Sequence, residues 1–427
     1  MIKKIFVYCI IFSIIILNIN RVSAQPSILS KSSILIDADS GTVLAEKDAN
    51  KKMYPASLTK IMTAILAIEM GNLSDVIKVD DDTPYEIDGS HIALEPGEML
   101  TLKDLLYALM LPSANDAASA IAKHYGGSIE KFVKLMNDKA KELGAVNTNF
   151  VNPHGLHNNN HYTTAYDLAL ITRYAMKNEI FRTIVGTQKY EIQPTNKKAE
   201  TRYFTNLNKM LYCGSSSQII VDGNWVSPLY EGTTGVKTGY TPEAGNSLVS
   251  SVKKNGTELI VVALNGVSLE MYQDAHNLFN YGFKEYQSTT LIYKNTYVQN
   301  LSISNGDSKE ISVITESNFS TLAKKEAVAK IKSKIIIDDI KLPLEKNAVI
   351  GKMEFYLDDK SIGSVNLITP TSVKSTLPEA SKGKSKILTV IKSIAILMLI
   401  LYGIKMYNNV RIKINRKKRR KKFRADI

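Results

Sequence analysis

Ser57 and Lys60 are the side chains with the clearest potential for covalent chemistry in this sequence. They lie three residues apart at the start of a predicted helix, so both side chains lie on one helical face. A serine hydroxyl becomes a good nucleophile only when a base removes its proton, and a lysine can do so when burial or nearby positive charge lowers its pKa. Backbone N–H groups at the start of a helix favour the developing negative charge. The alternative interpretation is a capping serine beside a solvated lysine.

Two further motifs carry polar groups suited to binding a peptide. Ser113-Ala114-Asn115 lies between two predicted helices, where a hydroxyl and an amide could relay a proton and hold a peptide carbonyl; an ordinary helix N-cap is the alternative. Lys237-Thr238-Gly239 begins a run expected along a sheet edge. There a lysine and a hydroxyl could bind the terminal carboxylate of an extended peptide, and glycine allows close backbone approach; a turn before a strand is the alternative.

The elements around these motifs predict an α+β catalytic domain. Strands are expected at Ser33–Asp37 and Thr42–Ala45, and again at Asn246–Val252 and Glu258–Leu264, the last two joined by an Asn255-Gly256 hairpin turn. Helical spacing of apolar residues fills the region between them. The sequence therefore predicts a sheet assembled from distant segments, with a helical insert.

The rest of the chain divides by composition into further parts. After a boundary near 290, short β-rich segments predict a small all-β domain, and a segment rich in Ser, Lys and Pro predicts a linker. Hydrophobic stretches flank the whole at both ends. The expected parts are a signal peptide (1–24), a catalytic domain (25–290), a β-rich domain (291–371), a linker (372–386), a membrane anchor (387–407) and a basic cytoplasmic tail (408–427).

The two ends also predict where the protein resides. Lys3 and Lys4 precede an apolar run that ends in Val22-Ser23-Ala24, the pattern of a secretory signal peptide. Near the C-terminus an apolar stretch interrupted by Lys392 is followed by a dense basic cluster, which belongs on the cytoplasmic side of a membrane. We expect a single-pass cell-membrane protein with its catalytic domain on the extracytoplasmic side; an interfacial helix is the alternative to a true span.

The formal net charge of +13 is confined to the two ends. Residues from 405 onward carry +10 and the first 24 carry +3, so residues 25–404 sum to zero. The charge therefore indicates topology and attraction to anionic lipid, and argues against a nucleic-acid partner. Cys213 is the one cysteine of the expected mature chain, so no intrachain disulfide is possible there.

Taken together, the three motifs resemble those of the penicillin-recognising serine enzymes, S-x-x-K, S-x-N and K-T-G, in the same order. This agreement is far more specific than Ser-x-x-Lys, which begins at five serines of this chain. The closest resemblance is to the D-alanyl-D-alanine carboxypeptidases of the low-molecular-mass penicillin-binding class, peptidase family S11, and it covers about Ser30 to Tyr286. It rests on Tyr54–Thr63, Leu111–Ala118, Asn152–Leu156, Thr163–Ala169 and Gly235–Thr241.

The resemblance implies a role for each motif residue. Ser57 would be the acylated nucleophile, Lys60 its general base, and Ser113 part of the proton path to the leaving D-alanine. Asn115 would hold the substrate backbone, and Lys237 and Thr238 its carboxylate, within a motif completed by Gly239. Backbone N–H groups of Ser57 and Tyr240 would form the oxyanion hole.

The resemblance also implies the fold, the partners and the reaction. The fold would be a β-lactamase/transpeptidase-like domain, an antiparallel five-stranded sheet with helices and a helical subdomain, followed by the β-rich domain and the anchor. Peptidoglycan stem peptides would be substrates and β-lactams inhibitors, with no cofactor and no metal. Between Asn115 and Lys237 there is no Glu-x-x-Leu-Asn, which supplies the deacylating glutamate of class A β-lactamases, so slow release of a penicilloyl enzyme is expected.

Competing interpretations remain open at this stage. His154, His157 and His161 could suggest zinc, but they lie among Pro, Gly and Asn, so a loop that shapes the cleft explains them better. The leading function is a carboxypeptidase that releases terminal D-alanine. A DD-endopeptidase or transpeptidase would use the same acyl-enzyme, and a catalytically silent wall-binding protein would keep only the fold.

Overall fold

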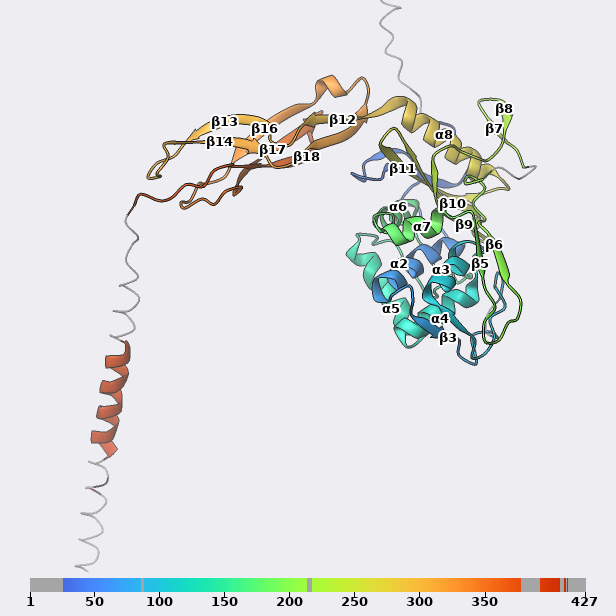
Figure 1. The fold of residues 1–427 in the computed structure, drawn as a ribbon, viewed down its shortest axis with the longest axis horizontal. Coiled ribbons are helices and arrows are strands. Elements are labelled where there is room, and N and C mark those ends of the chain that lie inside the picture. The colour runs from blue at the N-terminus through green and yellow to red at the C-terminus, as the bar shows by residue number, and fades with distance from the viewer. Residues whose placement is uncertain are drawn as a thin grey trace, which may run out of the picture. The chain divides into compact units, whose positions relative to one another are not determined.

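The computed structural model describes residues 26–85, 88–212, 217–377 and 392–407, together with 411 and 413. The predicted signal peptide, Cys213, residues 378–386 of the predicted linker and most of the basic tail lie outside these residues. Contacts between α-carbons divide the chain into two units, one of Met1–Leu291 with Ser320–Ile331 and one of Ile292–Phe319 with Lys332–Ile427. Each unit is described by itself (Figure 1).

A five-stranded antiparallel sheet forms the centre of the first unit, in the order β2-β1-β11-β10-β9. Its strands are β1 (Ser32–Asp37), β2 (Val43–Lys47), β9 (Thr233–Thr241), β10 (Gly245–Lys254) and β11 (Thr257–Gly266). Asn255 and Gly256 both have positive φ, 50° and 80°, as a two-residue hairpin turn requires. The five-stranded antiparallel sheet and the Asn-Gly hairpin are therefore confirmed.

Apolar side chains cover both faces of this sheet. Along β1, Ile34 and Ile36 pack into one hydrophobic cluster, whereas Leu35 packs into another, as the alternation of a strand demands. The first cluster joins the sheet to the helices α2 (Lys60–Met70), α3 (Leu102–Met110), α4 (Asn115–Gly126), α5 (Ile129–Glu142), α6 (Ala165–Ala175) and α7 (Glu179–Gly186). The second joins it to α8 (Glu270–Glu285).

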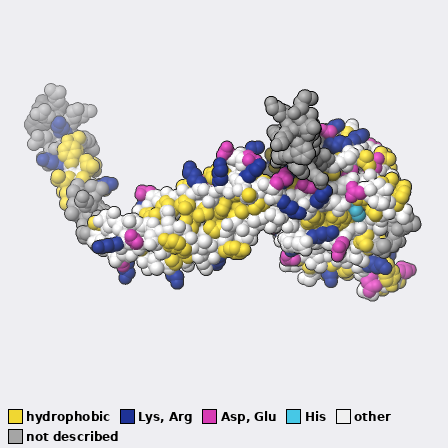
Figure 2. Space-filling view, turned by 90° about the horizontal axis from the view of Figure 1, so that it is seen from above, with side chains coloured by type: hydrophobic (Ala, Val, Ile, Leu, Met, Phe, Trp, Pro, Cys, Tyr) yellow, Lys and Arg dark blue, Asp and Glu magenta, His cyan; other side chains and the backbone are white. Residues whose placement is uncertain are grey.

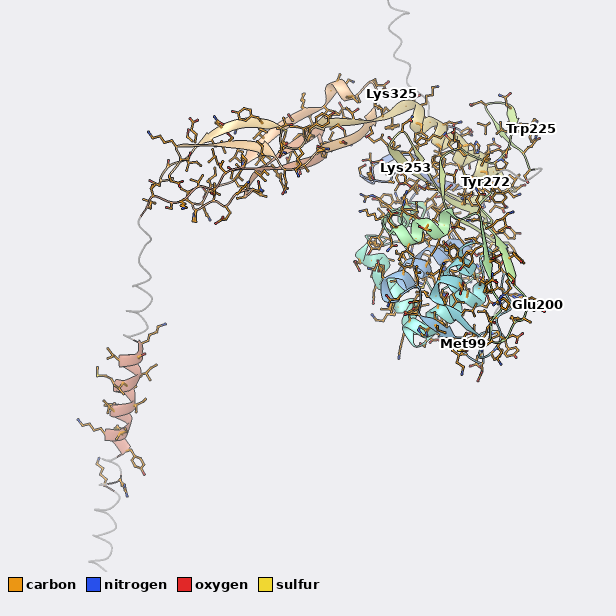
Figure 3. All side chains as sticks on the ribbon, viewed as in Figure 1. Met99, Glu200, Trp225, Lys253, Tyr272 and Lys325 are labelled. Atoms are coloured by element: carbon orange, nitrogen blue, oxygen red, sulfur yellow. The ribbon has the colours of Figure 1, made fainter. Side chains whose placement is uncertain are left out.

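Helix α8 also secures loops on its side of the sheet. The buried Asp274 carboxylate accepts hydrogen bonds from the N–H groups of Leu29 and Ser30, at 2.8 and 2.7 Å. Tyr272, labelled in Figure 3, donates its hydroxyl proton to the Leu207 carbonyl at 3.2 Å. These contacts hold the start of β1 and the segment before β7 against the helix.

Four two-stranded sheets complete the first unit's regular structure among the described residues. They pair β3 (Val76–Lys78) with β4 (Met99–Thr101), β5 (Lys189–Ile192) with β6 (Arg202–Thr205), β7 (Ile219–Val221) with β8 (Asn224–Val226), and β12 (Tyr286–Ile292) with β15 (Phe319–Lys324). The last pair brings a segment from beyond residue 291 back to the first unit. No pattern in the sequence predicts this return.

The second unit is built on another five-stranded sheet, in the order β13-β14-β18-β17-β16. The strands are β13 (Tyr297–Ser302), β14 (Glu310–Thr315), β16 (Lys332–Ile337), β17 (Val349–Leu357) and β18 (Lys360–Ile368). A short 3₁₀ turn of the first unit, η2 (Val328–Lys330), precedes β16 in the chain. The core of the second unit is apolar, with Val313, Phe355 and Leu367 buried.

Toward the C-terminus, residues 392–407 are helical. No helix in the described part of the chain is both long enough and apolar enough to cross a membrane. The first five residues of the predicted anchor, 387–391, lie outside the described residues.

Candidate active site

Ser57 lies in a 3₁₀ turn, η1 (Ala56–Thr59), that leads directly into α2. The predicted helix start is therefore confirmed, with its first turn wound more tightly than an α-helix. Ala56, just before the serine, has a φ of +48°, an unusual conformation for a residue with a Cβ atom. The chain thus turns sharply at the residue that presents Ser57.

Lys60 occupies the first position of α2, and its side chain is fully buried. Its Nζ lies 3.0 Å from Ser57 Oγ, 2.7 Å from Asn115 Oδ1 and 2.7 Å from the carbonyl oxygen of His154. The spacing of Ser57 and Lys60 in the sequence thus places the two functional atoms in hydrogen-bond contact.

These three partners determine what a neutral Lys60 amine can do. The His154 carbonyl can only accept, and Asn115 presents its oxygen because its Nδ2 donates to the Asp88 carbonyl at 2.6 Å. The two hydrogens of a neutral amine are therefore used by these acceptors. Its lone pair is left for the hydroxyl proton of Ser57, the arrangement that a general base requires.

Burial, and after it the positive charge of Lys237, lowers the pKa of Lys60 well below its usual value, while the Asp116 carboxylate opposes the shift. A lysine is an effective base only when it is deprotonated, so this direction favours proton abstraction.

The second motif lies in the short loop between α3 and α4, as predicted. Ser113 has a φ of +68° and is buried, and its Oγ has no hydrogen-bond partner among the described residues. A buried hydroxyl without a partner is unfavourable in a packed core. Such a hydroxyl is explained when a group that enters the site supplies the missing hydrogen bond. Asn115, two residues later, begins α4 and keeps one Nδ2 hydrogen available after its bond to Asp88.

The third motif lies on β9, the edge strand of the central sheet. Lys237 is buried, and burial lowers its pKa to about 7. Its Nζ donates to the Thr238 carbonyl at 3.2 Å. The predicted sheet-edge position of Lys237 and Thr238 is confirmed.

Gly239 and Tyr240 continue β9 beside the nucleophile. A Cβ added to Gly239 would lie 3.2 Å from the Ser57 nitrogen and 3.1 Å from the Pro55 carbonyl oxygen, so this strand and the serine turn pack backbone to backbone. The side chain of Tyr240 is 62% exposed, which leaves its main chain as the part suited to the site.

Loop backbone groups were the part of the site that the sequence did not predict. The carbonyls of Asp88 and His154 have no side-chain signature, and Ser90 likewise contributes only its carbonyl, which accepts from the Asn115 N–H at 2.7 Å. Asp116 could have been suspected from its place after the motif. Its carboxylate accepts from the N–H groups of Ile92 and Leu94.

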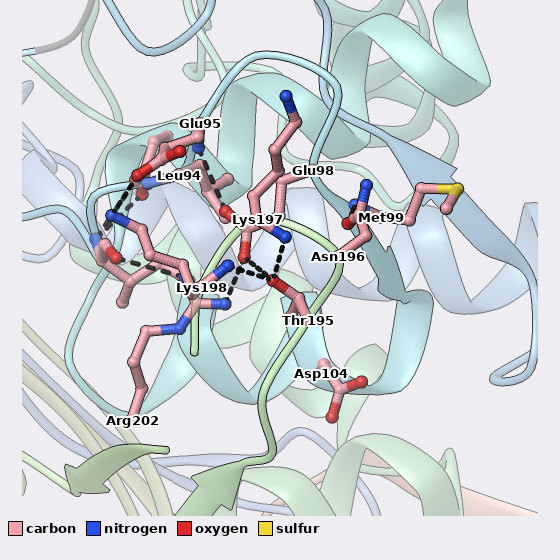
Figure 4. Close-up of polar contacts among 12 residues, drawn as sticks. Leu94, Glu95, Glu98, Met99, Asp104, Thr195, Asn196, Lys197, Lys198 and Arg202 are labelled. Carbon is pink, nitrogen blue, oxygen red and sulfur yellow. Dashed lines mark hydrogen bonds and ion pairs between the residues drawn. The ribbon is translucent and has the colours of Figure 1, made fainter. Parts of the chain in front are cut away.

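A buried ion pair supports the loop of residues 88–98, which contacts Asn115, at the C-terminal end of that loop. Glu98 is fully buried, and its Oε1 accepts from Arg202 Nη2 at 2.5 Å and from the Thr195 hydroxyl at 2.8 Å. Figure 4 shows Arg202 of β6 and Thr195 of the segment before β6 converging on Glu98. The loop that contacts Asn115 is therefore anchored at Asp116 and at Glu98.

The histidine segment contacts the site without forming a metal centre within the described residues. No group of three His, Cys, Asp or Glu side chains in that part of the chain is arranged to hold a metal ion. His157 packs edge-on against Tyr54, with ring centroids 4.6 Å apart, and the Nε2 of His161 lies 2.8 Å from the Thr59 hydroxyl.

Comparison with family models divides the chain in two. The model described as D-alanyl-D-alanine carboxypeptidase, peptidase S11, matches residues 19–268. The model of the penicillin-binding protein 5 C-terminal domain matches residues 286–375. Together the two models account for the five-stranded catalytic fold and the all-β unit that follows it.

Individual relatives agree with this division. The D-alanyl-D-alanine carboxypeptidase DacF of Bacillus subtilis is 34% identical over 361 residues, which cover 82% of this chain and 86% of that protein. Penicillin-binding protein 5 of Haemophilus influenzae superposes with a TM-score of 0.66 at 26% identity, over 82% of this chain and 99% of its own. A variant of a Streptomyces DD-transpeptidase superposes with a TM-score of 0.55 at 33% identity, over 61% of this chain and 100% of its own.

Proposed function

Because this chain belongs to the D-alanyl-D-alanine carboxypeptidase family, peptidase family S11, we propose that it removes the terminal D-alanine from peptidoglycan stem pentapeptides. The observation that carries the proposal is the contact of Ser57 Oγ with a buried Lys60 amine whose other two partners are carbonyl oxygens. This arrangement supplies a nucleophile and a base of lowered pKa.

In the proposed acylation, Lys60 takes the hydroxyl proton and Ser57 Oγ attacks the carbonyl carbon of the penultimate D-alanine. The negative oxygen that forms binds the N–H groups of Ser57 and Tyr240. The C–N bond then breaks, and a proton delivered through Ser113 leaves with the amine of the terminal D-alanine. Water hydrolyses the ester and frees the shortened peptide.

The substrate is proposed to lie as an added strand along the free edge of β9. Lys237 and Thr238 bind its terminal carboxylate, and the remaining N–H of Asn115 Nδ2 binds its backbone. β-lactams imitate this substrate, and their acyl-enzyme is released slowly because the chain lacks the Glu-x-x-Leu-Asn segment.

The test is mass spectrometry of the protein after incubation with penicillin, with release of D-alanine from a stem pentapeptide measured in parallel. One adduct on the peptide that contains Ser57, absent in Ser57→Ala, is expected together with D-alanine release. A protein that neither forms the adduct nor releases D-alanine would instead be a silent wall-binding member of the fold.

Transpeptidation is the second candidate, favoured by the likeness to the Streptomyces DD-transpeptidase. It uses the same acyl-enzyme but transfers the peptide to an amine instead of water. Adding an amino acceptor to the pentapeptide assay separates the two: a carboxypeptidase yields mainly tetrapeptide, and a transpeptidase yields mainly the amide. A DD-endopeptidase would cleave a cross-linked dimer in the same assay.

We also propose that the protein is exported and held at the cell membrane with its catalytic unit outside. The signal-peptide pattern and the apolar stretch followed by basic residues in the sequence support this. Protease added to intact spheroplasts should digest the catalytic unit, and its protection there would contradict the proposed orientation.

A further inference from the structure

A chain of three hydrogen bonds, two of them buried and one partly buried, runs from the segment of His154, His157 and His161 to the turn that holds the nucleophile. The Val151 N–H donates to His161 Nδ1 at 3.2 Å, His161 Nε2 and Thr59 Oγ1 are 2.8 Å apart, and the Thr59 hydroxyl donates to the Ala56 carbonyl at 2.8 Å. Thr59 is fully buried and His161 is 2% exposed. None of these side chains has a part in the proposed acyl transfer.

The partners fix the position of every proton in this chain. The single hydroxyl proton of Thr59 is given to the Ala56 carbonyl, so Thr59 Oγ1 must accept from His161 Nε2–H. His161 Nδ1 must then be unprotonated, because it accepts from a backbone N–H. Burial, and after it the electrostatic effects of His157 and Lys60, lowers the pKa of His161 to about 4, which agrees with this neutral tautomer.

The Ala56 carbonyl matters because it shares a peptide plane with the Ser57 N–H. In a trans peptide the C=O and N–H point in opposite directions, so a clamp on the carbonyl also sets the direction of the N–H. The hydrogen bond to the Ala56 carbonyl helps to hold an unfavourable backbone conformation. The φ of +48° costs about 1–2 kcal/mol for a residue with a Cβ atom.

The two sides of this peptide plane are closely packed. On the carbonyl side, a Cβ added to Gly155, whose φ is +93°, would lie 1.8 Å from the Ala56 oxygen. On the other side, Gly239 of β9 lies against the Ser57 nitrogen. Small rotations of the plane would therefore move the N–H relative to β9, where the second oxyanion donor, the Tyr240 N–H, is expected.

We propose that His161 is a positioning residue, which orients the Ser57 N–H of the oxyanion hole through the Thr59 hydroxyl and the Ala56 carbonyl. The inference rests on the proposed function, in which that N–H binds the developing negative oxygen. Among the described residues His161 makes no hydrogen bond to Ser57 Oγ or Lys60 Nζ, which bond to each other, while Lys60 Nζ also bonds to Asn115 Oδ1 and the His154 carbonyl. It therefore acts on the geometry of the oxyanion hole and leaves the base unchanged.

The test separates this role from simple packing. His161→Phe keeps a ring beside Phe150, whose centroid is 5.7 Å from that of His161, but removes both nitrogens. His161→Gln retains an N–H donor toward Thr59 and an acceptor. Thr59→Val removes the hydroxyl with little change of shape, whereas Thr59→Ser keeps it. For each full-length protein we would measure the rate of acylation by penicillin and kcat/KM for D-alanine release between pH 5 and 9, together with Tm.

Loss of one oxyanion donor costs about 10²–10³-fold in rate, so a misdirected donor should cost about 10–100-fold. His161→Phe and Thr59→Val should both show this loss, and the double variant should be no worse than either single variant because they break one chain. His161→Gln and Thr59→Ser should recover most of the rate. The acid limb of the pH profile should stay in place, since Lys60 keeps its partners.

Several results would overturn the inference. Wild-type rates in His161→Phe or Thr59→Val, additive losses in the double variant, or a displaced acid limb would each exclude the positioning role while the enzyme remained active. A His161→Phe protein that fails to fold leaves Thr59→Val and Thr59→Ser to decide. A wild-type protein that neither binds penicillin nor releases D-alanine would overturn the proposed function, and this inference with it.

Discussion

The two units of the chain differ in what they bury. The catalytic unit encloses charged side chains, among them Lys60, Glu98, Asp116, Lys237 and Asp274, and surrounds most of them with backbone carbonyls or N–H groups. Among the described residues of the second unit, no charged side chain is buried, and the buried polar groups are two threonine hydroxyls. Figure 2 shows apolar and basic side chains along the outer surface of the β-rich unit.

This difference separates the demands of chemistry from those of folding. A buried charge costs free energy, so it persists where a reaction or a loop geometry needs it. A sheet with an apolar core needs none. If this explanation is right, the buried charges of the catalytic unit fall into two classes: those whose removal harms activity and those whose removal harms stability.

Lys60 should show the largest effect on activity. Lys60→Met removes the general base, and we expect acylation by penicillin to slow by about 10³-fold. Stopped-flow measurements with a fluorescent penicillin would record the rate. Because the substitution replaces a buried polar amine with an apolar side chain of similar length, Tm should not fall. A rate within tenfold of the wild type, or a collapse of Tm, would place Lys60 in the structural class.

Arg202 should show the largest effect on stability. Arg202→Met leaves the fully buried Glu98 carboxylate without its ion-pair partner, at an expected cost of about 3–5 kcal/mol. Urea unfolding would measure the change. Lys198→Met is the matched control, because its pair with Glu95 is more exposed, at 25% and 44% of the two side chains, and should contribute less than about 1 kcal/mol. Equal effects of the two substitutions would contradict the distinction.

Leu322 tests where the division between the units lies. It follows residue 291 in the sequence, but it is 7% exposed and packs into the second hydrophobic cluster of the catalytic unit. Leu322→Ala should destabilise that unit by about 2–3 kcal/mol. Ile335→Ala, at a side chain 39% exposed on β16, should change stability by less than about 0.5 kcal/mol. Calorimetry that resolves the transitions of the two units would show whether Leu322 affects the catalytic one.

Lys237 gives the smallest effect, which appears in the pH dependence. Burial lowers its pKa to about 7, so the free protein loses this positive charge as the pH rises above 7. If the charge binds the substrate carboxylate, kcat/KM should fall about tenfold by pH 8 relative to its plateau, apart from any opposing gain as Lys60 deprotonates. Lys237→Arg keeps its charge, so its alkaline limb should disappear. An alkaline limb that persists in this variant would belong to another group.

Much of this architecture could be predicted from local sequence patterns. The Asn255-Gly256 turn, the two strands that it joins and the helix after Ser57 are local signals, and the structure confirms them. The contact of Ser57 with Lys60 also follows from local spacing on a helix, although confirmation needed coordinates.

Other parts of the site depend on contacts between distant segments. The Asp88 and His154 carbonyls are separated from Lys60 by 28 and 94 residues, and a carbonyl is common to every residue type, so no pattern identifies them. The histidines were predicted to belong to a loop that shapes the cleft. The bond from His161 to Thr59 crosses 102 positions of sequence and could be found only in the folded chain.

The return of Ser320–Ile331 to the catalytic unit has a mechanical consequence. The chain passes between the two units three times, after Leu291, after Phe319 and after Ile331. Tension applied from the C-terminal end therefore reaches the catalytic unit through three connections, two of which, at Phe319 and Ile331, flank β15. β15 is joined to its partner segment by the Lys325 N–H to Glu285 carbonyl bond and by the Thr290–Ser320 hydroxyl pair. The load is thus shared between the paired strands β12 and β15 before it reaches α8.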